Sequence, residues 1–228
     1  MFVPEVIAHA HTDFASKFGI PRQSGRVEAL VARIVFVPKY RNPDALRGIE
    51  GFSHLWLIWH FSKVEQSGAF RPTVRPPRLG GNQVEGVFAT RSPYRPNPIG
   101  LSSVKLLSVE HTEQEGDVLI VGGADLLDGT PIFDIKPYLP FTDSHPDAVG
   151  GFAAPLSGYA LSVVCDEELL SRLPEEKRDA LISVLREDPR PAYQEDPTRV
   201  YGFPFAGHEI KFSVSDGVLT VLDIQKNS

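Results

Sequence analysis

The sequence predicts a mainly β protein in which a small closed β-barrel, or a sandwich, precedes a smaller α+β unit. Two observations predict this fold class. The 228-residue chain holds 19 glycines and 20 prolines, a share above the usual ~12% for these two residues, so turns are frequent. Short runs rich in Val and Ile follow one another up to about residue 135 without helical patterns between them, which favours antiparallel β structure.

The first third of the chain supplies two predicted strands. Residues 25–38, GRVEALVARIVFVP, mix apolar and polar side chains and end at a proline, so they predict one long strand. A short helical turn is expected at 43–46, because proline favours the first helical position. Residues 53–62, SHLWLIWHFS, are almost continuously apolar and predict a strand that is buried on both faces.

The middle of the chain predicts a long loop and four further strands. Residues 66–86 contain three prolines and four glycines without periodicity, and loops of that length in compact domains are usually functional or disordered. Val- and Ile-rich segments bounded by Gly, Pro or Asp predict strands at 87–89, 101–109, 118–122 and 132–135.

A change of pattern divides the chain into predicted domains at 1–156 and 157–228. In the second domain, GYALSVVCD predicts a strand and Asp166 is a suitable helix N-cap. The following helix, LPEEKRDALISVLRED, places Leu173, Leu181, Val184 and Leu185 on one face. The segments VYGFPF, HEIKFSV and GVLTVLDI predict strands, the last two joined in a hairpin at 215–217.

The charge is distributed unevenly along an acidic chain. The net charge is −6, which argues against a sequence-independent coat for nucleic acids. Residues 71–100, however, carry five arginines and one acid, whereas 166–196 carry ten acids and five basic residues. A basic patch is therefore expected in the first domain.

Several classes of protein are excluded by missing patterns. The N-terminus lacks a basic region followed by an apolar stretch, and the longest apolar segment is about ten residues where a membrane span needs about 20. We therefore expect a cytoplasmic protein without membrane contact. Neither the Rossmann glycine fingerprint nor a P-loop occurs, and the histidines lack metalloprotease spacing, so no metal is expected.

Four segments carry candidate binding chemistry, each with a simpler alternative. Pro21-Arg22-Gln23 offers a forked guanidinium suited to a carboxylate, or is a plain turn before a strand. His60-Phe61 suits a flat purine, or His60 is a satisfied core histidine. In 89–102, ATRSPYRPNPIGLS, three prolines stiffen a loop that presents Arg91 and Arg95, or these arginines form surface ion pairs. Residues 128–131, DGTP, are a binding corner or only a tight turn.

Taken in order, GIPRQ, GFSHLWLIWHF, VFATRSPYRPNPIGLS, LLDGTPIFDIKPYLP and RPAYQEDPTRVYGFPFAG resemble the TsaA-like, TrmO-type family of tRNA methyltransferases. The resemblance covers nearly the whole chain. It implies a small non-Rossmann β-barrel that binds S-adenosyl-L-methionine, with a short C-terminal domain, in a homodimer. It also implies methylation of N6 in threonylcarbamoyladenosine, just 3′ of the anticodon, in tRNAs that read threonine codons.

The same resemblance implies which residues hold the methyl donor. They are Pro21, Arg22, Gln23, His60, Phe61, Arg91, Leu101, Asp128, Gly129, Thr130 and Pro131. No catalytic residue is implied. Asp134, His60 or the Asn97 carbonyl could each take a proton from the amine, and the sequence does not choose between them.

Two functions of different class follow. The first is the S-adenosylmethionine-dependent methyltransferase that acts on the anticodon stem-loop of threonine tRNA. The alternative is a non-catalytic barrel that binds an adenine nucleotide and acts as a regulator or adaptor. Both keep a purine site, and only the first transfers a methyl group.

Overall fold

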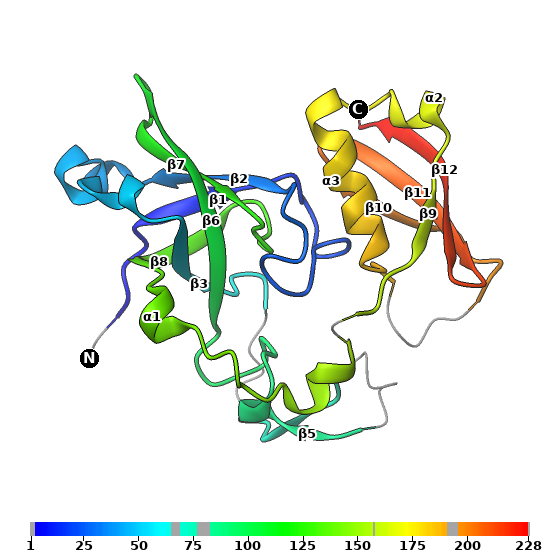
Figure 1. Ribbon diagram of the computed structural model, residues 1–228, viewed down its shortest axis with the longest axis horizontal. Coiled ribbons are helices and arrows are strands. Elements are labelled where there is room, and N and C mark those ends of the chain that lie inside the picture. The colour runs from blue at the N-terminus through cyan, green and yellow to red at the C-terminus, as the bar shows by residue number, and fades with distance from the viewer. Residues whose placement is uncertain (1–2, 65–68, 77–82, 157, 191–195, 228) are drawn as a thin grey trace.

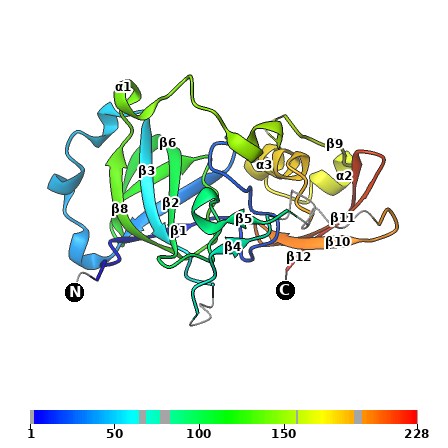
Figure 2. The same ribbon diagram turned by 90° about the horizontal axis from the view of Figure 1, so that it is seen from below.

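The computed structural model describes residues 3–64, 69–76, 83–156, 158–190 and 196–227. As predicted, the protein is mainly β (Figure 1). Two sheets lie side by side, and helix α3 (Glu175–Arg186) lies over one face of the smaller sheet in both views (Figures 1 and 2). In the part of the chain that the structure describes, no helix is long and apolar enough to cross a membrane.

The larger sheet is a closed barrel of six strands in the order β1-β2-β7-β6-β3-β8. Each strand pairs with two neighbours, and all these pairs are antiparallel. The strands are β1 (Ala8–His11), β2 (Val31–Phe36), β3 (His54–His60), β6 (Ile99–Thr112), β7 (Gly116–Gly122) and β8 (Thr130–Pro137).

Side chains in the barrel alternate between a buried interior and an outer face. In β3, Leu55, Leu57 and Trp59 are buried, whereas the residues between them are partly exposed. The prediction that this strand is buried on both faces is therefore wrong. Only one face of a closed sheet meets the interior, so the aromatic side chains that point outward remain available to a ligand.

Two predicted strands differ from the structure. Residues 25–30 precede β2 as a loop, because Gly25 has a φ of 75° and the Leu30 amide donates to the Val27 carbonyl at 3.2 Å. Residues 87–89 form the 3-10 helix η5 (Val87–Ala89), since the Thr90 amide and hydroxyl both donate to the Val87 carbonyl. Local hydrogen bonds prevail over β-propensity in both segments.

The remaining expectations for the first domain are largely confirmed. The strands predicted at 101–109, 118–122 and 132–135 lie within β6, β7 and β8. The expected loop at 66–86 contains a small pair, β4 (Thr73–Val74) and β5 (Glu85–Gly86), while 66–68 and 77–82 lie outside the described residues. The helical segments here are η1 (Pro38–Tyr40), η2 (Pro43–Leu46), η3 (Ile49–Gly51), α1 (Pro140–Asp143) and η6 (Gly151–Leu156).

The smaller sheet has the strand order β10-β11-β12-β9. Asp166 caps a short helix through a 2.8 Å bond from the Glu168 amide, as predicted. The second helix is shorter than the predicted 173–188: it buries Leu181, Val184 and Leu185, while Leu173 is buried in the bend before it. The elements are β9 (Ser162–Val164), α2 (Glu167–Leu170), α3, β10 (Tyr201–Phe205), β11 (His208–Ser215) and β12 (Val218–Lys226).

A segment between β1 and β2 contributes to the core of the second sheet. Phe14, Val27 and Leu30 belong to the same buried cluster as the apolar residues of α3 and β10–β12. The Phe14 and Phe205 rings pack edge to face at 5.4 Å. The core of the C-terminal unit thus includes residues from the N-terminal part of the chain, and the predicted boundary at 156/157 stays a prediction.

Candidate functional site

The register of three barrel strands brings several of the predicted residues to one end. Trp59, near the end of β3, lies opposite Gly100 of β6 on one side and Ile132 of β8 on the other. His60-Phe61, Leu101 and Thr130-Pro131 each lie within two residues of these positions. Segments far apart in the sequence therefore meet at this end of the barrel.

The outer face of this end is aromatic and apolar. The His60 ring stacks on the Phe133 ring, with centroids 5.6 Å apart and an interplanar angle of 26°. Leu101 is 54% exposed. Its partner Ile58 pairs on the other side with Asp134. Flat rings, an exposed leucine and a carboxylate thus lie on neighbouring strands, a combination that suits a purine and its polar substituents.

The inner face holds a polar chain rather than an open cavity. The indole N–H of Trp59 donates to the Ser102 hydroxyl at 2.9 Å, and that hydroxyl donates to Asp125 at 2.6 Å. Phe61 packs its ring 4.2 Å from that of Trp59, so its ring serves the barrel core. A side chain at Gly100 would lie 2.2 Å from the indole, which explains the glycine.

Arg91 and Gln23, two of the residues implied to hold the donor, lie in contact. The Arg91 guanidinium donates to the Gln23 side-chain oxygen. The neighbouring Ser24 accepts a 3.1 Å bond from the Ser103 amide through its hydroxyl, and the Gly25 amide donates to the Gly123 carbonyl at 2.9 Å. The loop that carries Gln23 is therefore fixed to β6 and to the segment between β7 and β8.

Asp125 is the polar residue at this end that the sequence reasoning missed. Burial raises the pKa of its carboxyl, while the bonds from Ser102 and Ser24 and the charge of Arg91 act in the opposite sense. The available signal was an acid between apolar neighbours in GGADLLDG, directly before the predicted turn.

The turn at 128–131 is tied to β1. The Thr12 amide donates to the Asp128 carboxylate at 3.1 Å, and the Gly129 amide donates to the Ala10 carbonyl at 2.8 Å. Thr130 is 3% exposed, and its hydroxyl donates to Leu127 at 2.6 Å. The predicted tight turn is confirmed. The role of these residues in donor binding stays a prediction.

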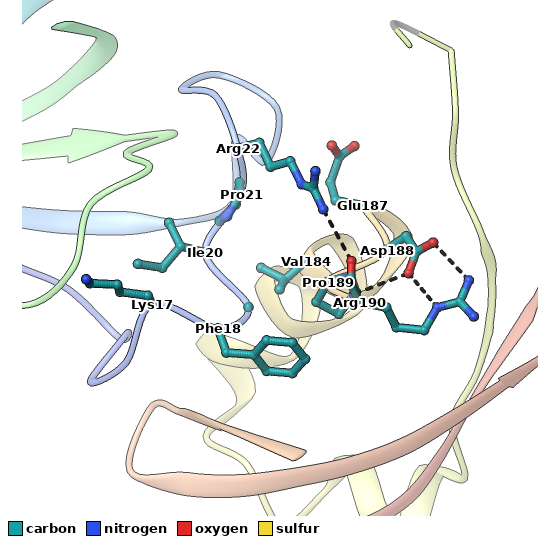
Figure 3. Close-up of a pocket in the computed structure, with 11 residues that line it drawn as sticks. Lys17, Phe18, Ile20, Pro21, Arg22, Val184, Glu187, Asp188, Pro189 and Arg190 are labelled. Carbon is teal, nitrogen blue, oxygen red and sulfur yellow. Dashed lines mark hydrogen bonds and ion pairs between the residues drawn. The ribbon is translucent and has the colours of Figure 1, made fainter. Parts of the chain in front are cut away.

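Pro21 and Arg22 line a separate pocket between the N-terminal segment and the end of α3. This pocket measures about 280 Å³ and is bounded by residues 17–22, 184 and 187–190 (Figure 3). Arg22 reaches across it and donates to the Arg190 carbonyl at 3.2 Å. The structure therefore turns Arg22 toward the C-terminal unit, whereas Gln23 turns toward Arg91.

Ion pairs neutralise much of the charge around this pocket. Arg190 donates to Asp188 at 2.8 and 3.0 Å, and Tyr159 donates to the same carboxylate at 2.8 Å. Burial acts to raise the pKa of Asp188, but these bonds prevail and lower it. Arg26 forms two 2.9 Å bonds with Glu187. The pocket joins the two parts of the chain rather than presenting an open anion site.

The three candidate proton acceptors differ in their surroundings. Asp134 pairs with Lys136 at 2.8 Å, and both lie on one face of their strand. The Asn97 carbonyl accepts from the Ile99 amide at 2.7 Å, and His60 is stacked on Phe133. Among the described residues, no group of three or more His, Cys, Asp or Glu could hold a metal ion.

Comparisons with known proteins agree with this arrangement. The chain is 40% identical to a tRNA (adenine(37)-N6)-methyltransferase of Escherichia coli K12 over 97% of both chains. It is 50% identical to a protein of the same name from Eikenella corrodens, over 75% of this chain and 95% of that relative. The name of a Pseudomonas aeruginosa relative, 41% identical over 86% of this chain and 85% of that relative, contains the words S-adenosylmethionine-dependent methyltransferase.

Solved structures and family models give the same result. The crystal structure of TrmO from Pseudomonas aeruginosa matches with a TM-score of 0.78 at 30% identity, over 98% of both chains. The model of the tRNA-methyltransferase O N-terminal domain matches residues 9–144, and that of the TrmO C-terminal domain matches 159–227. The chain therefore belongs to the tRNA-methyltransferase O family.

Proposed function

We propose that this protein is an S-adenosyl-L-methionine-dependent tRNA methyltransferase that acts on N6 of adenosine 37. The observation that carries the proposal is the match to named methyltransferases over both parts of the chain. The contact between Gln23 and Arg91, beside the exposed outer face at one barrel end, supports it. Action on tRNA agrees with the cytoplasmic location predicted from the sequence.

The residues at this end have the chemistry that the methyl donor requires. Arg91 suits the donor carboxylate, because a guanidinium binds carboxylates through two parallel N–H bonds. The stacked rings of His60 and Phe133 suit the flat adenine, and the exposed Leu101 suits its apolar edge. The proposed donor site further includes residues 21–23, 61 and 128–131.

The protein's part in the reaction is mainly alignment. When bound, S-adenosyl-L-methionine supplies a methyl group already activated by its sulfonium. The side chains of the barrel end hold the reacting groups in line, and correct orientation alone can lower a barrier by about 7–11 kcal/mol. Asp134, His60 and the Asn97 carbonyl are the proposed alternatives for accepting the amine proton.

The basic arm formed by residues 69–76 and 83–95 is proposed to hold the anticodon loop. Arg71 and Arg75 are exposed there. The Phe70 and Phe88 rings stack 6.2 Å apart while 59% and 71% exposed. Exposed aromatic rings beside cationic side chains suit unpaired bases and phosphates. The finer substrate, threonylcarbamoyladenosine in threonine tRNAs, and the homodimer rest on the family resemblance.

A methyl-transfer assay separates the enzyme from the non-catalytic alternative. The protein is incubated with donor labelled in its methyl group and with tRNA from a strain that lacks this methylation. We expect label in threonine tRNA, and loss of at least about tenfold of the rate in Arg91→Ala, because a charged hydrogen bond contributes about 1.5–3 kcal/mol.

The matched control is Arg47→Ala, an exposed arginine that pairs with Asp44 on a 3-10 helix turn. It is expected to keep the wild-type rate. Binding of S-adenosylhomocysteine without any label in tRNA would instead favour the regulator or adaptor. Absence of both would remove a donor site from this protein.

A further inference from the structure

A continuous polar network runs through the barrel end and ends at Arg91. It begins at the Trp59 indole on β3, passes through the Ser102 hydroxyl on β6, and reaches Asp125 after β7. Ser103, the residue after Ser102, donates its amide to the Ser24 hydroxyl at 3.1 Å, and Gln23, one residue before Ser24, accepts from Arg91. The carboxylate of Asp125 thus fixes the part of β6 to which the loop that carries Gln23 is bound.

The residues after Gln23 are held from two sides. The Ser24 hydroxyl accepts from the Ser103 amide at 3.1 Å. The next residue, Gly25, donates its amide to the Gly123 carbonyl at 2.9 Å. These bonds leave the backbone beside Gln23 little freedom, so the side-chain oxygen of Gln23 is presented to Arg91 in a fixed direction.

Fixing a turn with a buried carboxylate is unfavourable in free energy. Ser102 is inaccessible to solvent, and the apolar neighbours Ala124 and Leu126 are 3% and 1% exposed. Transfer of a charged group into such surroundings is strongly unfavourable unless it is paired. An asparagine could accept the Ser102 hydroxyl equally well. The negative charge itself therefore has a use, and the charge that acts on it is that of Arg91.

We propose that Asp125 is a positioning residue that holds Gln23 and Arg91 in the geometry needed to bind the methyl donor. This inference rests on the proposed function. Asp125 binds Ser102, which precedes the residue that holds Ser24, and its charge attracts the Arg91 guanidinium, so it acts on the donor only through these residues. Its loss changes donor affinity more than the rate of the chemical step.

The test is a double-mutant cycle read out by calorimetric titration with S-adenosylhomocysteine. Asp125→Asn keeps size and one acceptor but removes the charge, and we expect donor-product binding to weaken about tenfold. In an Arg91→Ala background the same change is expected to have almost no further effect, because residues that act through one contact are not additive. In turnover, KM for the donor rises about tenfold and kcat changes little.

Two further variants complete the test. Ser24→Ala removes only the bond from the Ser103 amide, so it loosens the same turn while Asp125 stays in place. It is expected to weaken binding several-fold, and again not in the Arg91→Ala background. The matched control, Asp117→Asn, removes a carboxylate that pairs with His111 at the far end of the barrel. It is expected to bind as the wild type does.

The outcomes are distinguishable. Wild-type protein that does not bind S-adenosylhomocysteine would overturn the donor site and the inference together. Wild-type protein that binds, with Asp125→Asn or Ser24→Ala binding equally well, would overturn the inference alone. If Asp125→Asn weakens binding as much in the Arg91→Ala background as in the wild type, the inference would also be overturned, because Asp125 would then not act through Arg91. If Asp125→Asn does not fold, Ser24→Ala decides the question by the same criteria.

Discussion

Two opposing effects act on the charge of the Asp125 carboxyl. Apolar neighbours and a buried serine surround it, which disfavours the charged form of the carboxyl, while its hydrogen bonds and the Arg91 charge favour that form. Burial prevails, and the pKa of Asp125 is raised. Part of the folding free energy of the protein is therefore given up to keep a negative charge beside Arg91.

This conflict predicts a pH-dependent stability difference. A carboxyl whose pKa is raised on folding stabilises the protein most below its unfolded value of about 3.9, and this stability is lost as the pH rises through the folded pKa. Denaturant unfolding of wild type and Asp125→Asn between about pH 4 and pH 7 is expected to show the wild type losing stability relative to the variant. A pH-independent difference would contradict the assignment.

At the scale of residues, the sequence predicts local turns and helix caps but not contacts between residues far apart in the chain. The Asp128 turn and the Asp166 cap follow from short-range rules and are confirmed. The family resemblance implied that Gln23 and Arg91 both hold the methyl donor, but not that they pair with each other. The bond from the Ser103 amide to the Ser24 hydroxyl joins residues 79 positions apart, and no periodicity or spacing predicts it.

At the scale of elements, strand β3 depends on a close approach between neighbours. Trp59 lies flat against Gly100 of β6, and a Cβ at that position would fall 2.2 Å from the ring. The indole is also fixed by its bond to Ser102. The ring therefore has no alternative position within the packed barrel.

Gly100→Ala is consequently expected to lower the free energy of unfolding by about 1–3 kcal/mol, the usual cost of overpacking a core. The measurement is urea unfolding followed by tryptophan fluorescence. Gly86→Ala is the matched control, because Gly86 also lies in a strand, β5, and a Cβ there would meet no atom within 4 Å. Equal effects of the two substitutions would contradict this account of the β3–β6 contact.

The predicted elements match the structure where the side-chain pattern decides the conformation, and differ from it where the local backbone does. The helix at 175–186 has a repeating apolar face, and three of its buried residues, Leu181, Val184 and Leu185, were predicted. Segments 25–30 and 87–89 contain β-branched residues but are shaped by glycine geometry and hydrogen bonds to the preceding turn. Composition indicates strand there, and the local backbone decides otherwise.

At the scale of the whole molecule, the two sheets are joined by a shared core. Phe203 of β10 is 1% exposed, and Gly19 approaches its ring so closely that a Cβ there would lie 2.3 Å away. The Ala206 amide donates to the Asp13 carbonyl at 3.0 Å, and Lys177 pairs with Asp13 at 2.7 Å. Both apolar and polar contacts thus connect the N-terminal segment to the C-terminal unit.

Phe203→Ala is expected to destabilise the protein by about 3–5 kcal/mol, as for other buried phenylalanines. Because the ring packs against the segment that leads to Gln23, binding of S-adenosylhomocysteine is expected to weaken as well. Denaturant unfolding and calorimetry measure the two effects. Val200→Ala, at a neighbouring residue that is 56% exposed, serves as the control. Full stability of Phe203→Ala would mean that the shared core contributes little.

The path of residues 12–30 has a consequence for building chimeras within the family. Phe14, Val27 and Leu30 complete the hydrophobic interior of the C-terminal sheet, although a family-model match would assign them to the other domain. If residues 159–227 alone were exchanged between relatives, their core side chains would have to pack against Phe14, Val27 and Leu30 of a different protein. A working hybrid therefore requires the β1–β2 connection to be transplanted together with the tail, and the donor-binding loop would travel with it.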